Sequence, residues 1–128
     1  MWRLLFVLAS LVDARPSPIV GSALFHGGQP LIGRIRGHDT ALPPEAVRCV
    51  NCHATRRISR ALLLEARQRR GGPPTRYDQP AFCKLLRTGI DPGYVLIARE
   101  MPIYDVDEAQ CAGLWRYLTG KENARGDR

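Results

Sequence analysis

The feature that most constrains this chain is the run Cys49-Val50-Asn51-Cys52-His53. Cys-x-x-Cys-His is the spacing by which proteins attach a c-type haem. Two cysteines three positions apart on a helical turn can each bond a vinyl group of one porphyrin, and the adjacent histidine then lies below the iron. The run therefore predicts one covalently bound haem c, held by Cys49 and Cys52, with His53 as the proximal iron ligand.

Three other interpretations of the motif remain open at this point. A thioredoxin-like redox pair also uses Cys-x-x-Cys, but the βαβ pattern expected around it is missing. A disulfide between Cys49 and Cys52 would leave His53 without a role. A structural zinc site would need two further ligands, and no known zinc spacing is matched. The side chains available for it are Cys83, Cys111, His26 and His38.

The N-terminal residues 1–14 predict a signal peptide. Arg3 precedes an apolar run from Leu4 to Val12, and Val12-Asp13-Ala14 offers small residues for a cleavage site after Ala14. A core helix or an uncleaved anchor is the alternative, although this run is too short to span a bilayer. We expect cleavage after Ala14, a periplasmic or otherwise exported protein, and no membrane span in the mature chain. Cysteines can pair in such an oxidising compartment.

The rest of the chain predicts one domain at residues 15–120 and a flexible tail at 121–128. Of 128 residues, 45% are hydrophobic and 24% charged, which argues against a disordered chain. Five segments have helical patterns and none shows strand alternation. They run from Pro18 to Gly27, from Pro43 to Cys49, from Ile58 to Gly71, from Asp78 to Gly89, and from Asp105 or Asp107 to Gly120. We therefore expect an all-α fold of about five short helices wrapped around one covalently attached haem.

Met101 is the candidate for the distal iron ligand. Signal cleavage would remove Met1 and leave Met101 as the sole methionine. It lies directly before Pro102, in a loop ahead of the last predicted helix, where its side chain can be aimed at a cofactor. Thioether sulfur stabilises ferrous iron, and His/Met ligation raises the potential of a haem. The alternative is a methionine that fills a gap in the core.

These residues resemble the class I c-type cytochromes, a family of mono-haem electron carriers. The resemblance extends from about Pro18 to Gly120. Beside the haem motif it rests on three stretches. They are Gly21 with Leu24-Phe25, Leu86-Arg87-Thr88-Gly89 with Asp91-Pro92, and Met101-Pro102-Ile103-Tyr104 followed by Asp107-Glu108 and Leu114-Trp115-Arg116-Tyr117-Leu118.

The resemblance implies further contacts. Gly21 and Phe25 of the first helix would cross the last helix, with Trp115 and Leu118 as partners. The carbonyl group that orients the His53 imidazole would belong to Pro73 or Pro74.

The sequence departs from the family before the haem motif. Phe25 and Cys49 are 24 positions apart, a longer spacing than the family usually has, so Gln29–Arg48 holds an insertion. His26 and His38 lie nearby and are the rival iron ligands. Each fits better as an ordinary loop or helix-end histidine.

Cys83 and Cys111 lie in the last two predicted helices. An even pair of remaining cysteines in an exported protein predicts a disulfide. It would tie these helices together and brace the loop that carries Met101. The alternative is two buried thiols that act as small apolar residues.

The chain is basic, with 19 Lys and Arg against 12 Asp and Glu. A basic run follows the haem motif, but no aromatic residues are interleaved with it, so nucleic acid is not an expected partner. We predict instead that Arg56, Arg57 and Arg60 form a docking face for acidic redox partner proteins. The alternative is a solvated helix face.

The expected function is one-electron transfer between redox partners, by a protein that is not itself an enzyme. Two alternatives belong to other classes. The first is a cytochrome subunit or haem enzyme with an open distal site, which would serve a dehydrogenase or an oxidase. The second is a binding module without haem, stabilised by zinc or a disulfide.

Overall fold

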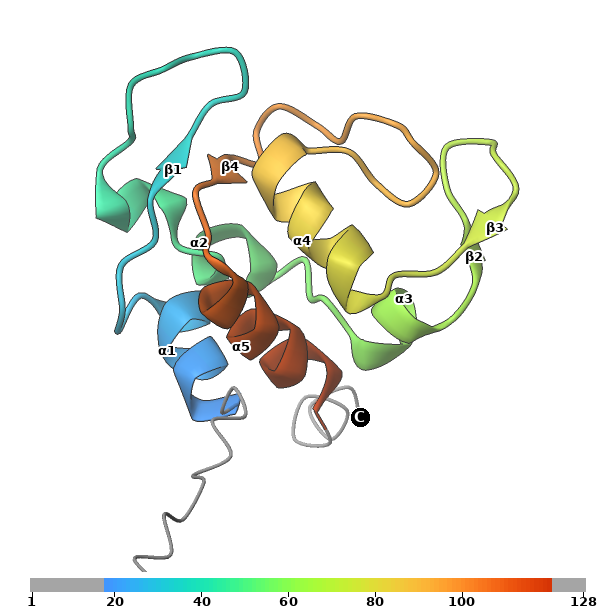
Figure 1. Cartoon of the computed structure of the whole chain (residues 1–128), viewed down its shortest axis with the longest axis horizontal. Coiled ribbons are helices and arrows are strands. Elements are labelled where there is room, and N and C mark those ends of the chain that lie inside the picture. Colours follow the sequence, from blue (N-terminus) through green and yellow to red (C-terminus); the bar gives the residue numbers. More distant parts are fainter. Residues whose placement is uncertain (1–17, 121–128) are drawn as a thin grey trace, which may run out of the picture.

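The structure is a computed structural model that describes residues 18–120 (Figure 1). The predicted signal peptide at 1–14 and the tail at 121–128 lie outside the described residues. The helices are α1 (Pro18–His26), η1, a 3-10 helix (Pro44–Val47), α2 (Val50–His53), α3 (Arg60–Leu64), α4 (Gln79–Thr88) and α5 (Glu108–Thr119). The strands are β1 (Gly33–Arg34), β2 (Arg67–Gln68), β3 (Pro74–Thr75) and β4 (Ile103–Tyr104). Within the described range, no helix has the length and apolar character that crossing a membrane requires.

The prediction of an all-α fold was wrong. Beside its helices, the described part of the chain contains two small antiparallel sheets, β1–β4 and β2–β3, so the fold is mixed α and β. Each strand has two residues, which is too short to show the alternation by which strands are detected in a sequence. The pairing of β1 with β4 also joins segments about 70 residues apart, which no local pattern indicates.

The last two long helices begin and end where the sequence predicts. Asp78 caps α4 by accepting a hydrogen bond from the Ala81 amide at 2.8 Å, and Gly89 ends that helix with a left-handed φ of 74°. Of the two cap candidates for α5, Asp107 is the cap. Its carboxylate and the side chain of Gln110 form a reciprocal capping box.

The middle of the chain differs from the prediction. The segment from Pro43 to Cys49 forms only η1, because Arg48 is extended (ψ 130°) and separates η1 from α2. The predicted helix from Ile58 to Gly71 is reduced to α3, and the residues after it form the β2–β3 hairpin. The Arg69 guanidinium donates to the carbonyl groups of Leu62 and Thr75 and holds this hairpin against α3. Such tertiary contacts override local helix preference.

Helices α1 and α5 pack against each other (Figure 1). A Cβ atom at Gly21 would overlap the carbonyl group of Gly113 and would approach the Tyr117 Cβ to 2.7 Å. Phe25 and Tyr117 then pack with ring centroids 5.5 Å apart. The crossing implied by the resemblance is therefore present, but Gly113 and Tyr117 lie against Gly21. Trp115 packs instead on Phe82 of α4, at 5.5 Å.

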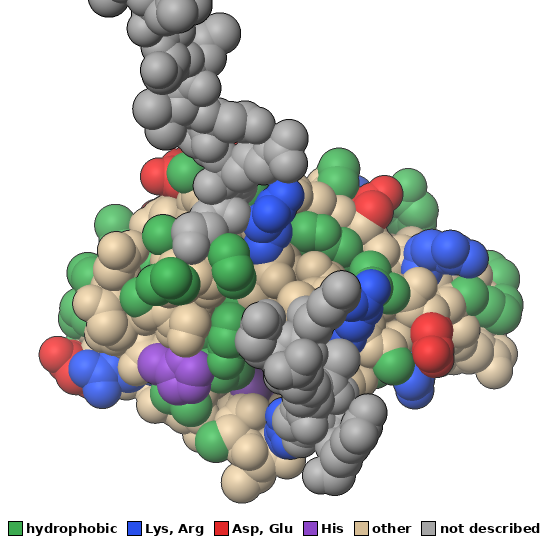
Figure 2. All heavy atoms as spheres, turned by 90° about the horizontal axis from the view of Figure 1, so that it is seen from below, with side chains coloured by type: hydrophobic (Ala, Val, Ile, Leu, Met, Phe, Trp, Pro, Cys, Tyr) green, Lys and Arg blue, Asp and Glu red, His purple; other side chains and the backbone are tan. Residues whose placement is uncertain are grey.

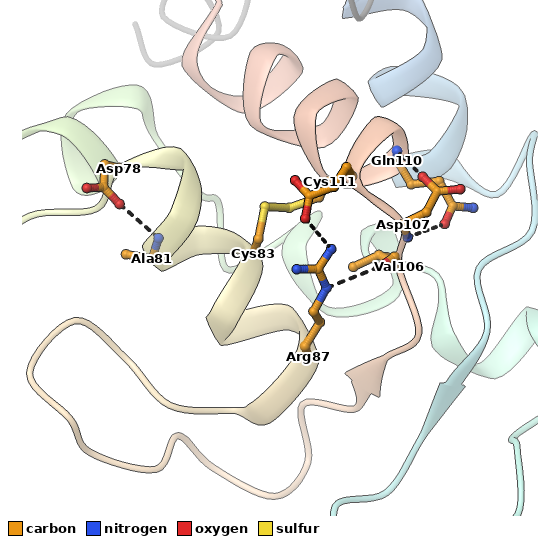
Figure 3. Close-up of a disulfide and its surroundings, with 9 residues drawn as sticks. Asp78, Ala81, Cys83, Arg87, Val106, Asp107, Gln110 and Cys111 are labelled. Atoms are coloured by element: carbon orange, nitrogen blue, oxygen red, sulfur yellow. Dashed lines mark hydrogen bonds and ion pairs between the residues drawn. A yellow bond between two sulfur atoms is a disulfide. The ribbon is translucent and has the colours of Figure 1, made fainter.

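Helix α4 is joined to α5 through Cys83 and Cys111 (Figure 3). Their sulfur atoms lie at bonding distance and their Cα atoms are 5.7 Å apart, within the usual range for a disulfide. Both side chains are buried. Beside them, Arg87 donates to the Val106 carbonyl and to Glu108, so the same two helices are also linked at the entry to α5. The pairing predicted from the sequence thus has disulfide geometry in the structure.

We predict that this disulfide is a main source of stability. Closing the 28-residue separation should contribute on the order of 3 kcal/mol to the free energy of unfolding. The Cys83→Ala/Cys111→Ala variant should therefore unfold at clearly lower urea concentration than the oxidised parent. Thiol reductant should lower the stability of the parent and leave that of the variant unchanged. A parent protein indifferent to reductant would show that the two thiols are not bonded.

Candidate functional site

An apolar cavity of about 410 Å³ lies between the helices. Residues of helices α1, α2, α3, α4 and α5 and of the loop before β4 form its walls. Phe25, Phe82, Leu86, Leu114 and Leu118 are among its buried lining residues. The volume is within the range of cofactor pockets. A hydrophobic group of cofactor size is therefore the kind of ligand that these walls suit.

The Cys-x-x-Cys-His residues form one end of this cavity. Cys49, Cys52 and His53 all line it, on or at the start of α2. Cys49 is half-buried and Cys52 is exposed, so one cysteine lies deeper than the other. Burial raises the pKa of the Cys49 thiol to about 11, as expected next to apolar walls. Asn51 fixes the short helix by donating from its side-chain amide to the Glu45 carbonyl, at 2.8 Å.

The His53 imidazole is held in one orientation. Its Nδ1 lies 2.8 Å from the carbonyl oxygen of Arg56. Because a carbonyl oxygen can only accept, Nδ1 carries a proton and donates it, and in the neutral ring Nε2 has the lone pair. A histidine whose other nitrogen is fixed in this way is prepared to bind a metal. The acceptor is the Arg56 carbonyl, whereas the resemblance implied Pro73 or Pro74.

Met101 lines the same cavity, although it is 48 positions from His53 in the sequence. Its side chain is half-buried, and its amide donates to the Ala98 carbonyl at 3.2 Å in a turn. Pro102, also a lining residue, follows it and leads directly into β4. The loop thus brings a thioether to a cavity that also contains an imidazole and two thiols.

The cavity also contains a buried hydroxyl group, on Tyr104. The hydroxyl donates to the Val47 carbonyl at 2.7 Å. Burial, and then the nearby Cys49 and Cys52, raise the pKa of Tyr104, so the phenol is neutral at physiological pH. Tyr104 belongs to the Met101 stretch of the sequence, but no local pattern indicates that it lines a cavity, because its partner is a backbone atom far away in the chain.

Positive charge surrounds the same cavity. Arg48, Arg56 and Arg70 are exposed residues that line it, with Glu100 as the acidic residue of the lining. Of the predicted docking residues, Arg56 and Arg57 are exposed, and Arg60 is half-buried at the first position of α3. On the face drawn in Figure 2, Lys and Arg side chains are scattered among hydrophobic ones, so that face has no single basic patch.

The structure does not bring together the alternative ligands for iron or for zinc. Neither His26 nor His38 is among the lining residues of the cavity, and His26 Nδ1 donates to the Ser22 carbonyl of its own helix at 2.9 Å. Across residues 18–120, no three or more His, Cys, Asp or Glu side chains lie close enough together to hold a metal ion. Cys83 and Cys111 are bonded to each other and could not serve a zinc site.

Comparison with models of known protein families, with curated proteins and with solved structures found no match to this chain. The resemblance to class I c-type cytochromes therefore rests on the residues and the cavity described above.

Proposed function

We propose that this chain is an exported mono-haem c-type cytochrome that carries single electrons between redox proteins and is not itself an enzyme. The observation that carries the proposal is the composition of one cavity. Cys49, Cys52, His53 and Met101, the four residues that covalent attachment and two axial ligands require, all line it. The Cys83–Cys111 pairing fits the oxidising compartment that export implies.

Each part of the cavity has a role in this proposal. Cys49 and Cys52 would form the thioether links, and His53 would present Nε2 because its Nδ1 is hydrogen-bonded to the Arg56 carbonyl. Met101 would supply a sulfur ligand to the iron. A haem held by these residues would supply a one-electron ferric/ferrous couple. The buried leucine and phenylalanine side chains exclude water, and Arg48, Arg56 and Arg70 supply positive charge for the carboxylate groups of the haem.

Loss of either motif cysteine should impair covalent haem attachment. We expect Cys49→Ala/Cys52→Ala, produced with haem-attachment machinery, to show no haem-stained band after denaturing electrophoresis. The Cys83→Ala/Cys111→Ala variant also lacks two cysteines and should retain the band. Equal staining of both variants would contradict the proposed attachment.

Met101→Ala should open the distal position, because the alanine side chain has no donor atom. We expect the ferrous protein to gain carbon monoxide binding, the weak red ferric band to disappear and the reduction potential to fall. Leu96→Ala, in the same loop but exposed and outside the cavity lining, should leave all three unchanged. An unaltered spectrum in Met101→Ala would assign the distal ligand to another residue. Carbon monoxide binding by the parent protein would favour the enzyme alternative.

We further propose that Arg56, Arg57 and Arg60 contribute to docking of an acidic redox partner. The support is positional, because Arg56 both lines the cavity and is exposed. Charge near the point of electron entry raises the rate of encounter with an oppositely charged molecule, and salt screens this effect.

If these arginines form a docking face, the rate of electron transfer to an anionic partner should depend on their charge. Arg56→Glu/Arg57→Glu should slow oxidation of the ferrous protein by the ferricyanide trianion about ten-fold at low ionic strength, with convergence at high salt. Lys84→Glu/Arg116→Glu makes the same change of net charge at exposed positions outside the cavity lining. It should slow the reaction much less. Equal slowing by both variants would show an effect of net charge alone.

A further inference from the structure

We infer that the inserted segment between α1 and the haem motif is a positioning strap, which holds the Met101 loop at a fixed place relative to α2. The inference rests on the proposed function, because it concerns how the distal ligand is held. The strap consists of residues 32–47, which include β1 and η1. It contacts the chain before Met101, the chain after it, and Asn51 of α2.

The contacts after Met101 are those of a small sheet. Strand β1 pairs with β4, which begins two residues after Met101, in the register Gly33 opposite Tyr104. The Asp105 amide donates to the Ile32 carbonyl at 2.9 Å. Arg34 Nη1 donates to both carboxylate oxygens of Asp105, at 2.7 and 2.9 Å. The chain that leaves Met101 is therefore hydrogen-bonded along one side of the strap.

The contact before Met101 is made by Arg36. Its Nη1 donates to the Ile97 carbonyl at 3.1 Å, in a part-buried position. Ile97 is held from its other side, because its amide donates to the Gly89 carbonyl at 2.8 Å. Ile97 is four positions before Met101 and lines the cavity. Arg36 and β1 thus fix the loop on both sides of the methionine.

The other end of the strap is fixed to α2, because the side-chain amide of Asn51 donates to the Glu45 carbonyl at 2.8 Å. Tyr104 donates to the carbonyl of Val47, which is almost fully buried (1% exposed) and is two residues before Cys49. The space between Gly33 and Val47 is closed, since a Cβ atom at Gly33 would come within 2.9 Å of the Val47 side chain. The two ends of the strap therefore pack together, and the strap is hydrogen-bonded both to the chain around Met101 and to α2. It sets the position of the distal ligand relative to the proximal one.

The test uses exogenous imidazole, which must displace Met101 from the ferric iron of the haem-loaded protein. Arg36→Met removes the hydrogen bond to Ile97 and keeps the aliphatic stem, and Tyr104→Phe removes the bond to Val47. Each should tighten imidazole binding about five-fold, the effect of losing one hydrogen bond that holds the competing ligand. The matched control is Arg69→Met, which also removes arginine-to-carbonyl hydrogen bonds, but on the β2–β3 side.

An increase in imidazole affinity for both strap variants and not for Arg69→Met supports the inference. Unchanged affinity in the strap variants, or an equal increase in Arg69→Met, overturns it. Amide hydrogen exchange of the peptide 97–105 in the same purified proteins gives a readout independent of haem. Faster exchange in Arg36→Met than in Arg69→Met supports the strap, and equal exchange overturns it. A parent protein without covalent haem would refute the proposed cytochrome, and the exchange data would still decide whether the strap holds the loop.

Discussion

The contact between α1 and α5 is the constraint on which the other elements depend. At Gly21 the two helices approach so closely that no side chain fits between them. Phe25 of α1 and Leu114 and Leu118 of α5 all line the cavity. Close packing of this kind tolerates little change in side-chain volume, so α1 and α5 are fixed relative to each other. Helix α4 then packs against α5, through Cys83–Cys111 and the contact between Phe82 and Trp115.

The residues of the candidate site were predictable from the sequence because their chemistry is local. Cys49, Cys52 and His53 are adjacent, and Met101 was left as the single methionine by the predicted signal cleavage. The caps Asp78 and Asp107 were predictable for the same reason, since a cap acts within one turn. The pairing of Cys83 with Cys111 followed from counting cysteines.

What the sequence did not reveal depends on distant or backbone partners. The fold was expected to be all-α, yet β1 finds its partner about 70 residues away and has too few residues to show a pattern. The acceptor for His53 was expected at Pro73 or Pro74 and lies instead at Arg56, because any residue can offer a carbonyl group. The third helix was predicted too long because Arg69 ties the following residues into a hairpin. In each case a tertiary contact decided the outcome.

The disulfide has a topological consequence for the Met101 loop. It closes residues 83–111 into a covalent ring, and the whole loop between α4 and α5 lies within that ring. A single cut of the backbone by a protease inside the loop would leave the two fragments linked. The ring also limits how far the loop ends can separate when the domain opens. If the Met101 side chain leaves the cavity, the ring keeps it close by, and it has only a short distance to move back.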